Sequence, residues 1–82
     1  MPKLPRDVSG IKLVSLLKKY DYKITRQTGS HIRLTSRYTG EEHNITIPAH
    51  KPIKIGTLNN ILKEVAEYLG ITKGELIKNL FG

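Results

Sequence analysis

The chain has 82 residues, no cysteine and a formal net charge of +7. At this length we expect one domain, residues 1–82, with a modest core; the lack of cysteine excludes disulfides, thiolate metal sites and a cysteine nucleophile. Residues 1–40 hold nine lysines and arginines against two acidic residues, whereas residues 41–82 hold five of each. The excess positive charge in the first half predicts a surface that faces a polyanion, with ordinary solubilising charge as the alternative.

The N-terminal segment does not resemble a targeting signal. Residues 1–6 lack the apolar core of a signal peptide, and no apolar run approaches the roughly 20 residues of a membrane span. We therefore expect a cytoplasmic protein without a membrane partner.

A first helix is predicted from Ser9, a good N-cap, to about residue 19. Its apolar stripe is formed by Leu13, Val14, Leu16, Leu17 and Tyr20. Three strand-like runs follow at residues 22–27, 31–36 and 44–48, and their connections predict two antiparallel hairpins.

The first hairpin is constrained by parity, because paired residues share a face of a sheet. A two-residue Gly29-Ser30 turn would pair Ile24 with Thr35 and put the apolar residues of the two strands on opposite faces. We therefore predict a three-residue loop, 27–29, with Gly29 left-handed and Ile24 paired with Ile32. The predicted outer face holds Lys23, Thr25, His31 and Arg33, joined by Asn44 and Thr46 from the third strand.

After the third strand, two prolines leave residues 49–51 irregular. A long helix is predicted from Thr57, as its cap, to Gly70. A short last helix follows, with Thr72 and Glu75 as a capping box.

His31 is the first candidate for chemistry, because imidazole, with an unperturbed pKa of about 6.5, exchanges a proton near neutral pH. Nearby cations, Arg33 with Arg26 and Lys23, favour its neutral form and attract a phosphate. The alternative is an ordinary polar strand residue. His50, in the irregular segment, is either functional or a capping or solvated loop residue.

A second candidate cluster is Lys51, Lys54 and Thr57, at the start of the long helix. Free N–H groups and the positive end of a helix dipole attract phosphate there, and the alternative is a pair of solvated lysines. The three histidines lack zinc-motif spacing, and no Walker, dinucleotide or serine-elbow sequence is present, so we expect no metal and no cofactor.

Several ordered segments resemble the HicA family, the small toxins of bacterial and archaeal HicAB toxin-antitoxin modules. They are Leu4-Pro5-Arg6-Asp7-Val8-Ser9-Gly10, Arg26-Gln27-Thr28-Gly29-Ser30-His31-Ile32-Arg33-Leu34, Ile47-Pro48-Ala49-His50-Lys51, and Ile55-Gly56-Thr57-Leu58 leading into Ile61-Leu62. The resemblance implies an α+β fold like a double-stranded RNA-binding domain, with helices on one face of a three-stranded antiparallel sheet. It also implies a ribonuclease that cleaves mRNA and is neutralised by a HicB-type antitoxin.

The family's catalytic histidine corresponds to His31, and a second, catalytic or structural, to His50. The resulting hypothesis is metal-independent RNA cleavage with His31 as general base on a ribose 2′-hydroxyl. The expected RNA-binding residues are Lys23, Arg26, Ser30, Arg33, Lys51, Lys54 and Thr57. The alternative is a non-catalytic RNA-binding module that recognises duplex RNA by its shape.

Two positions depart from the family's pattern. Asp21 stands where glycine is expected before the first strand, and the connection between the second and third strands carries two acidic residues, Glu41 and Glu42. Both bear on local backbone and groove shape more than on activity.

Overall fold

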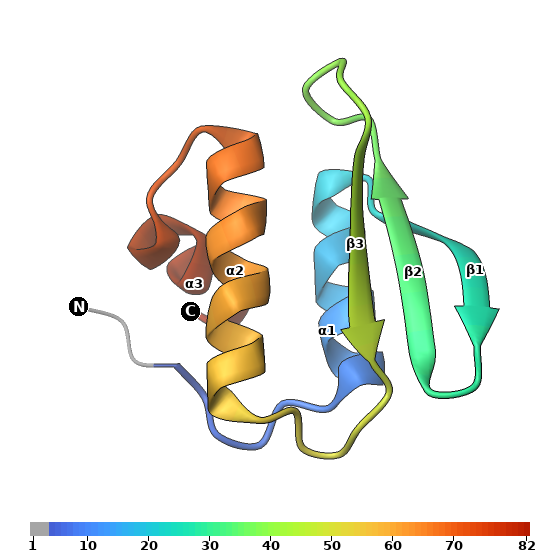
Figure 1. Ribbon diagram of the computed structural model, residues 1–82. Coiled ribbons are helices and arrows are strands. Elements are labelled where there is room, and N and C mark those ends of the chain that lie inside the picture. Colours follow the sequence, from blue (N-terminus) through green and yellow to red (C-terminus); the bar gives the residue numbers. More distant parts are fainter. Residues whose placement is uncertain (1–3) are drawn as a thin grey trace.

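A computed structural model describes residues 4–82 (Figure 1). The elements in chain order are α1 (Gly10–Leu17), the 3-10 turn η1 (Lys18–Tyr20), β1 (Lys23–Thr28), β2 (His31–Ser36), β3 (His43–Pro48), α2 (Ile55–Leu69) and α3 (Lys73–Phe81). The three strands form one antiparallel sheet in the order β1-β2-β3. The predicted element order is therefore confirmed, with the bounds of β1 and β3 moved by one residue.

The helices cover one face of the sheet. In Figure 1, α1 lies behind β3, α2 runs beside β3, and α3 lies against α2. The sheet residues that point toward the helices are buried, and they are Ile32, Leu34, Ile45 and Ile47. They pack with helix residues that include Leu13, Val14, Leu17, Leu58, Leu62 and Val65. This arrangement confirms the α+β fold with a double-stranded RNA-binding-domain-like order.

The predicted helix ends are largely confirmed because they depend on local capping. The Ser9 hydroxyl accepts the Lys12 N–H at 3.1 Å, and the Thr72 hydroxyl accepts the Glu75 N–H at 3.0 Å. Gly70 ends α2 with a left-handed φ of 72°. Asp21 also adopts a left-handed φ, of 64°, which explains why glycine suits this position.

The predicted start of α2 at Thr57 is wrong. The helix begins at Ile55, and Lys54 is its N-cap residue, without a side-chain capping bond. The cause is tertiary: Ile53 is buried, and its N–H donates to the Val8 carbonyl at 2.8 Å, which fixes where the chain turns into the helix. Thr57 consequently lies in the first turn of α2 rather than at its cap.

The predicted three-residue loop of the first hairpin is also wrong. Thr28 pairs with His31, so the connection is the two-residue Gly29-Ser30 turn, with Gly29 left-handed at φ 56°. Parity is restored by a β-bulge between Ile24 and Arg26. Ile24 is 52% exposed, because β1 is an edge strand whose six residues are all exposed. The premise that Ile24 belongs to the core was therefore incorrect.

The bulge redistributes the cations of β1. Arg26 pairs with Arg33, and since paired residues share a face, both lie on the outer face of the sheet. Lys23 pairs with Thr35 instead of lying opposite Arg33.

Candidate functional site

A cavity of about 350 Å³ lies where the end of β3 meets the first turn of α2. Its lining residues are His31, Thr46, Pro48, His50, Lys54 and Thr57. Figure 1 shows that the β1–β2 turn, the end of β3 and the start of α2 all lie at the same end of the molecule. The cavity is within the roughly 300–1,000 Å³ typical of small-ligand sites. It brings His31 and His50, which the sequence indicated as separate candidates, together with Lys54 and Thr57 from the predicted cluster at the start of the long helix.

His31 is held at this cavity by the strand register. It pairs with Thr28 on one side and with Pro48 on the other, at the first position of β2, and its side chain is exposed. Beyond the last strand pair, the Ala49 N–H donates to the Ser30 carbonyl at 2.6 Å and extends the ladder past the turn. His31 is thus outward-facing, as predicted, although the loop that places it there differs.

His50 lies in a segment with a fixed backbone. Its carbonyl accepts the Gly10 N–H at 2.9 Å, which joins it to the start of α1. This close approach requires glycine, because a Cβ at position 10 would lie 2.1 Å from the Pro48 carbonyl oxygen and 2.9 Å from Ala49 Cα. This role of Gly10 was not predicted from the sequence, where the only local signal was its place in the family-like segment.

Of the five cations predicted to bind RNA, four lie at or near the histidine cavity and one, Lys23, lies away from it. Lys54 lines the histidine cavity, Arg33 lines a neighbouring cavity, and Arg26 pairs with Arg33 across the sheet. Lys51 is exposed in the bend just before α2. Lys23 is not brought to the site: its ammonium lies 3.6 Å from Asp21, and its strand partner is four residues along β2 from His31, about 13 Å at strand spacing.

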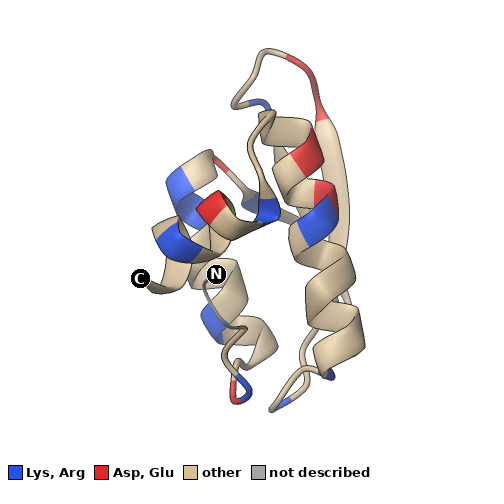
Figure 2. Cartoon of the chain, turned by 90° about the vertical axis from the view of Figure 1, so that its left-hand side faces the viewer, with Lys and Arg blue, Asp and Glu red and all other residues tan. Residues whose placement is uncertain are grey.

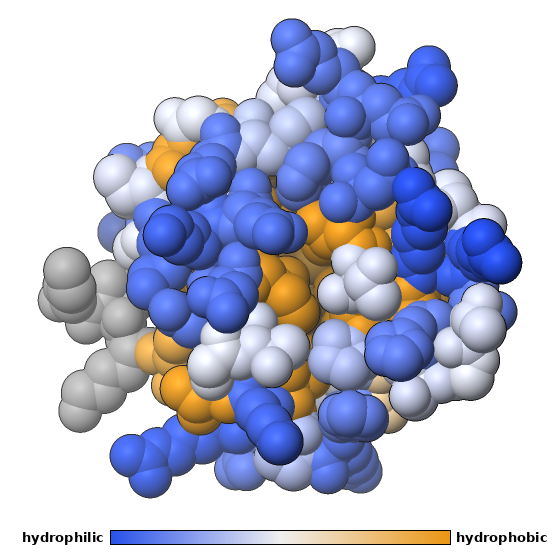
Figure 3. Space-filling model, viewed as in Figure 1, coloured by the Kyte–Doolittle hydropathy of each residue, from blue (hydrophilic) through white to orange (hydrophobic). Residues whose placement is uncertain are grey.

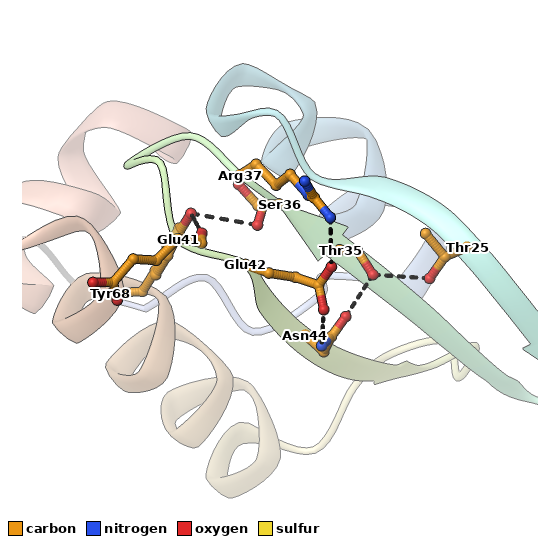
Figure 4. Close-up of polar contacts among 8 residues, drawn as sticks. All are labelled: Thr25, Thr35, Ser36, Arg37, Glu41, Glu42, Asn44 and Tyr68. Atoms are coloured by element: carbon orange, nitrogen blue, oxygen red, sulfur yellow. Dashed lines mark hydrogen bonds and ion pairs between the residues drawn. The ribbon is translucent and has the colours of Figure 1, made fainter.

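A row of polar side chains crosses the outer face of the sheet (Figure 4). The Thr25 and Thr35 hydroxyls lie 3.0 Å apart, and Thr35 donates to Asn44 Oδ1 at 2.6 Å. Asn44 Nδ2 in turn donates to Glu42 at 3.3 Å, and Arg37 also contacts that carboxylate, at 3.2 Å. The Asn44 hydrogen bond, followed by the Arg37 contact, lowers the pKa of Glu42. The row links the three strands at the end of the sheet away from His31.

The third histidine has a structural place. His43 Nδ1 lies 2.7 Å from the Tyr22 hydroxyl, and its ring stacks on Tyr68 with centroids 4.7 Å apart. Burial raises the pKa of Tyr22 well above its usual range. Tyr68 also accepts the Thr39 N–H at 3.2 Å, so this cluster ties the β2–β3 connection to α2. His43 does not line the histidine cavity.

Between β3 and α2, the surface charge changes from positive at the histidine cavity to negative near the C-terminal end of α2. Near the C-terminal end of α2, a further cavity is lined by four glutamates together with His43, Asn44 and Tyr68; the glutamates are Glu41, Glu42, Glu64 and Glu67. In Figure 2, the acidic residues of α2 and of the β2–β3 connection lie at one end of the molecule, and the lysines leading into α2 lie at the other. A polyanion is therefore attracted to the histidine end and repelled from the opposite end.

A family model described as the HicA toxin of bacterial toxin-antitoxin systems matches residues 10–66, more than half of the chain. The chain belongs to the HicA toxin family. The matched residues of this HicA toxin include every residue that lines the histidine cavity. Neither the curated proteins nor the solved structures contain a significant match.

Membership in the family makes this chain the toxin of a toxin-antitoxin pair. Across residues 4–82, the helices are too short or too polar to cross a bilayer. In the same residues, no three His, Cys, Asp or Glu side chains gather in a way that suits a metal ion.

Proposed function

We propose that this HicA toxin is an endoribonuclease that cleaves mRNA without a metal ion and is neutralised by a HicB-type antitoxin. The observation that carries the proposal is the cavity at which His31, His50 and Lys54 meet beside the first turn of α2. Two imidazoles and an ammonium at one small cavity are the groups needed to move protons and to neutralise charge at a phosphodiester.

His31 acts as the general base. It takes the proton of a ribose 2′-hydroxyl, the 2′-oxygen attacks the adjacent phosphorus, and the bond from phosphorus to the 5′-oxygen breaks. The departing 5′-oxygen takes a proton from His50, so the products are a 2′,3′-cyclic phosphate and a 5′-hydroxyl. General acid-base catalysis of this kind contributes about 10²–10⁴ in rate, and the remainder comes from positioning and charge stabilisation.

The phosphate is held at the start of α2. Lys54 supplies a positive charge beside the cavity, and Thr57, in the first turn, supplies a hydroxyl. The free N–H groups of that turn add the positive end of the helix dipole, which favours an anion by about 0.3–1 kcal/mol. Arg33 and Arg26, paired across the sheet, extend the cationic surface along the RNA.

The antitoxin is proposed to act on the same surface. A partner that places acidic residues over Lys54, Arg33 and Arg26 neutralises the positive charge of this surface. The same partner prevents RNA from reaching His31. Neutralisation then follows from occlusion and needs no change in the toxin's fold.

The test compares the wild-type protein with its His31→Ala and His50→Ala variants on RNA in excess chelator, with binding measured in parallel. We expect cleavage by the wild type, loss of about 10²-fold or more in each variant, and little change in RNA affinity. Lys23→Gln is the control, because Lys23 lies away from the cavity, and it should cleave like the wild type.

Two results would contradict the proposal. Equal cleavage by the wild type and His31→Ala would mean that the nuclease activity does not depend on His31. RNA binding without cleavage by the wild type would favour the non-catalytic RNA-binding module instead.

A further inference from the structure

A second and larger cavity lies next to the histidine cavity, between β3 and α2. Its volume is about 530 Å³, and it shares Thr46 and Thr57 with the histidine cavity. Its other lining residues include Arg33 from β2, Ile45 from β3, and Asn60, Ile61 and Glu64 from α2. Figure 3 shows hydrophobic atoms in the hollow in the middle of this face, with hydrophilic side chains around them. The two cavities are thus neighbouring parts of one surface.

The lining combines an apolar floor with planar polar groups. Ile45 and Ile61, which are 4% and 6% exposed, contribute the hydrophobic part. Arg33, Asn60 and Glu64 contribute a guanidinium, an amide and a carboxylate. Neither Arg33 nor Glu64 takes part in the two ion pairs found within residues 4–82, so these groups remain open to a ligand.

A nucleobase has the matching chemistry, because its faces are apolar and its edges carry hydrogen-bond donors and acceptors. Phosphate matches less well, since the Glu64 carboxylate offsets the positive charge of Arg33 in the same lining. Beyond the cavity, the cluster of glutamates repels the RNA backbone as well. These charges favour an arrangement in which the backbone crosses the cationic side of the sheet and a base enters the cavity.

We propose that this second cavity binds one unpaired nucleobase of the RNA, adjacent to the phosphodiester that is cleaved. The inference rests on the proposed function and names its substrate as unpaired RNA. Thr46 and Thr57 line both cavities, so a base in one is the immediate neighbour of a phosphate in the other. A base inside a duplex cannot enter, because it is stacked and its pairing edge is occupied.

The test uses His31→Ala protein, so that RNA stays intact during the measurement. Fluorescence anisotropy compares a short single-stranded RNA, the same RNA with one abasic nucleotide placed at successive positions, and the matching duplex. We expect one abasic position to weaken binding by about 5- to 30-fold, as for loss of one or two base contacts. We also expect the duplex to bind more weakly than the single strand.

The second substitution tests the pocket itself. In the double variant His31→Ala, Asn60→Ala, the loss of affinity caused by the abasic nucleotide (the abasic effect) should fall to less than about threefold. Asn60 is exposed on a helix, where alanine is a better helix former, so the variant is expected to fold. The matched control is Asn59→Ala, which alters a neighbour outside both cavities whose amide contacts Lys73; it should leave the abasic effect unchanged.

The outcomes separate this inference from the proposed function. An abasic effect that Asn60→Ala abolishes supports the nucleobase pocket even if the wild type proves unable to cleave RNA, in which case only the proposed nuclease activity fails. No abasic effect, or one that Asn60→Ala leaves intact, overturns the pocket while cleavage stands.

Discussion

Gly10 is the position where a single added methyl group should disturb the candidate site most. In the Gly10→Ala variant, the new Cβ would lie 2.1 Å from the Pro48 carbonyl oxygen and 2.9 Å from both Pro48 C and Ala49 Cα. Real Cβ contacts essentially never fall below 3.0 Å, so the two backbones must separate by at least about 0.9 Å. The separation also strains the 2.9 Å bond from the Gly10 N–H to the His50 carbonyl.

The magnitude follows from these two effects. Overpacking costs about 1–3 kcal/mol, and loss of a hydrogen bond about 0.5–1.5 kcal/mol. We therefore expect Gly10→Ala to lower the free energy of unfolding by about 2–4 kcal/mol, a large part of the 5–15 kcal/mol typical of a domain. Because a shift near 1 Å in a reacting group costs on the order of 10² in rate, RNA cleavage by the folded variant should fall by a similar factor.

Urea unfolding followed by circular dichroism measures the stability, and cleavage is assayed at low urea where the variant is folded. Gly56→Ala is the matched control, since Gly56 lies in the first turn of α2 and its added Cβ meets nothing within 4 Å. That substitution should be neutral or stabilise by up to about 1 kcal/mol. If Gly10→Ala proved as stable and as active as the wild type, the close approach of the two backbones would not position His50.

Three further predictions concern single groups. Tyr22→Phe removes the hydroxyl that lies 2.7 Å from His43 Nδ1 and should cost about 0.5–1.5 kcal/mol in urea unfolding at neutral pH. Because burial raises the pKa of Tyr22, the folded state keeps its proton when the unfolded state loses it; the wild type should therefore lose stability as the pH rises past the ordinary tyrosine value of about 10, and Tyr22→Phe should lose less. If the wild type and Tyr22→Phe lose the same stability above about pH 10, the buried Tyr22 hydroxyl is not the cause of the loss. Asn44→Ala should raise the pKa of Glu42, because the Asn44 hydrogen bond is the largest cause that lowers it, and an unchanged value in a carboxyl NMR titration would contradict the assignment. Lys54→Gln should weaken RNA binding for all sequences alike and reduce the slope of log affinity against log salt by about one; an unchanged slope would show that Lys54 makes no phosphate contact.

The sequence was most informative where structure depends on neighbouring residues. Ser9 and Thr72 mark helix starts by accepting N–H groups three residues ahead, and Gly70 marks a helix end by its own left-handed φ. These positions were predicted from the residue types alone. The order of elements follows from local periodicity. The family resemblance was also recognisable without coordinates, and the family match covers three of its four segments, those within residues 26–62.

The sequence was less informative where two distant segments must agree. Parity correctly required an irregularity in the first hairpin and predicted His31 and Arg33 to face outward. It does not say where the irregularity lies, and the prediction put it in the turn; the expected burial of Ile24 was wrong as well. The bulge lies within β1, because an edge strand left uncovered by the helices is free to shift its register. That shift turns Arg26 to the outer face, which no local pattern indicates.

The sequence by itself determined the elements of this HicA toxin, its cationic first half, and three unconnected candidates for the site: His31, His50 and the cluster that contains Lys54 and Thr57. Only the tertiary structure brought those four side chains to one cavity and left a second cavity beside it. The physical reason is that the meeting depends on contacts between segments far apart in the chain. Gly10 lets α1 approach residues 48–50, and buried Ile53 sets the start of α2.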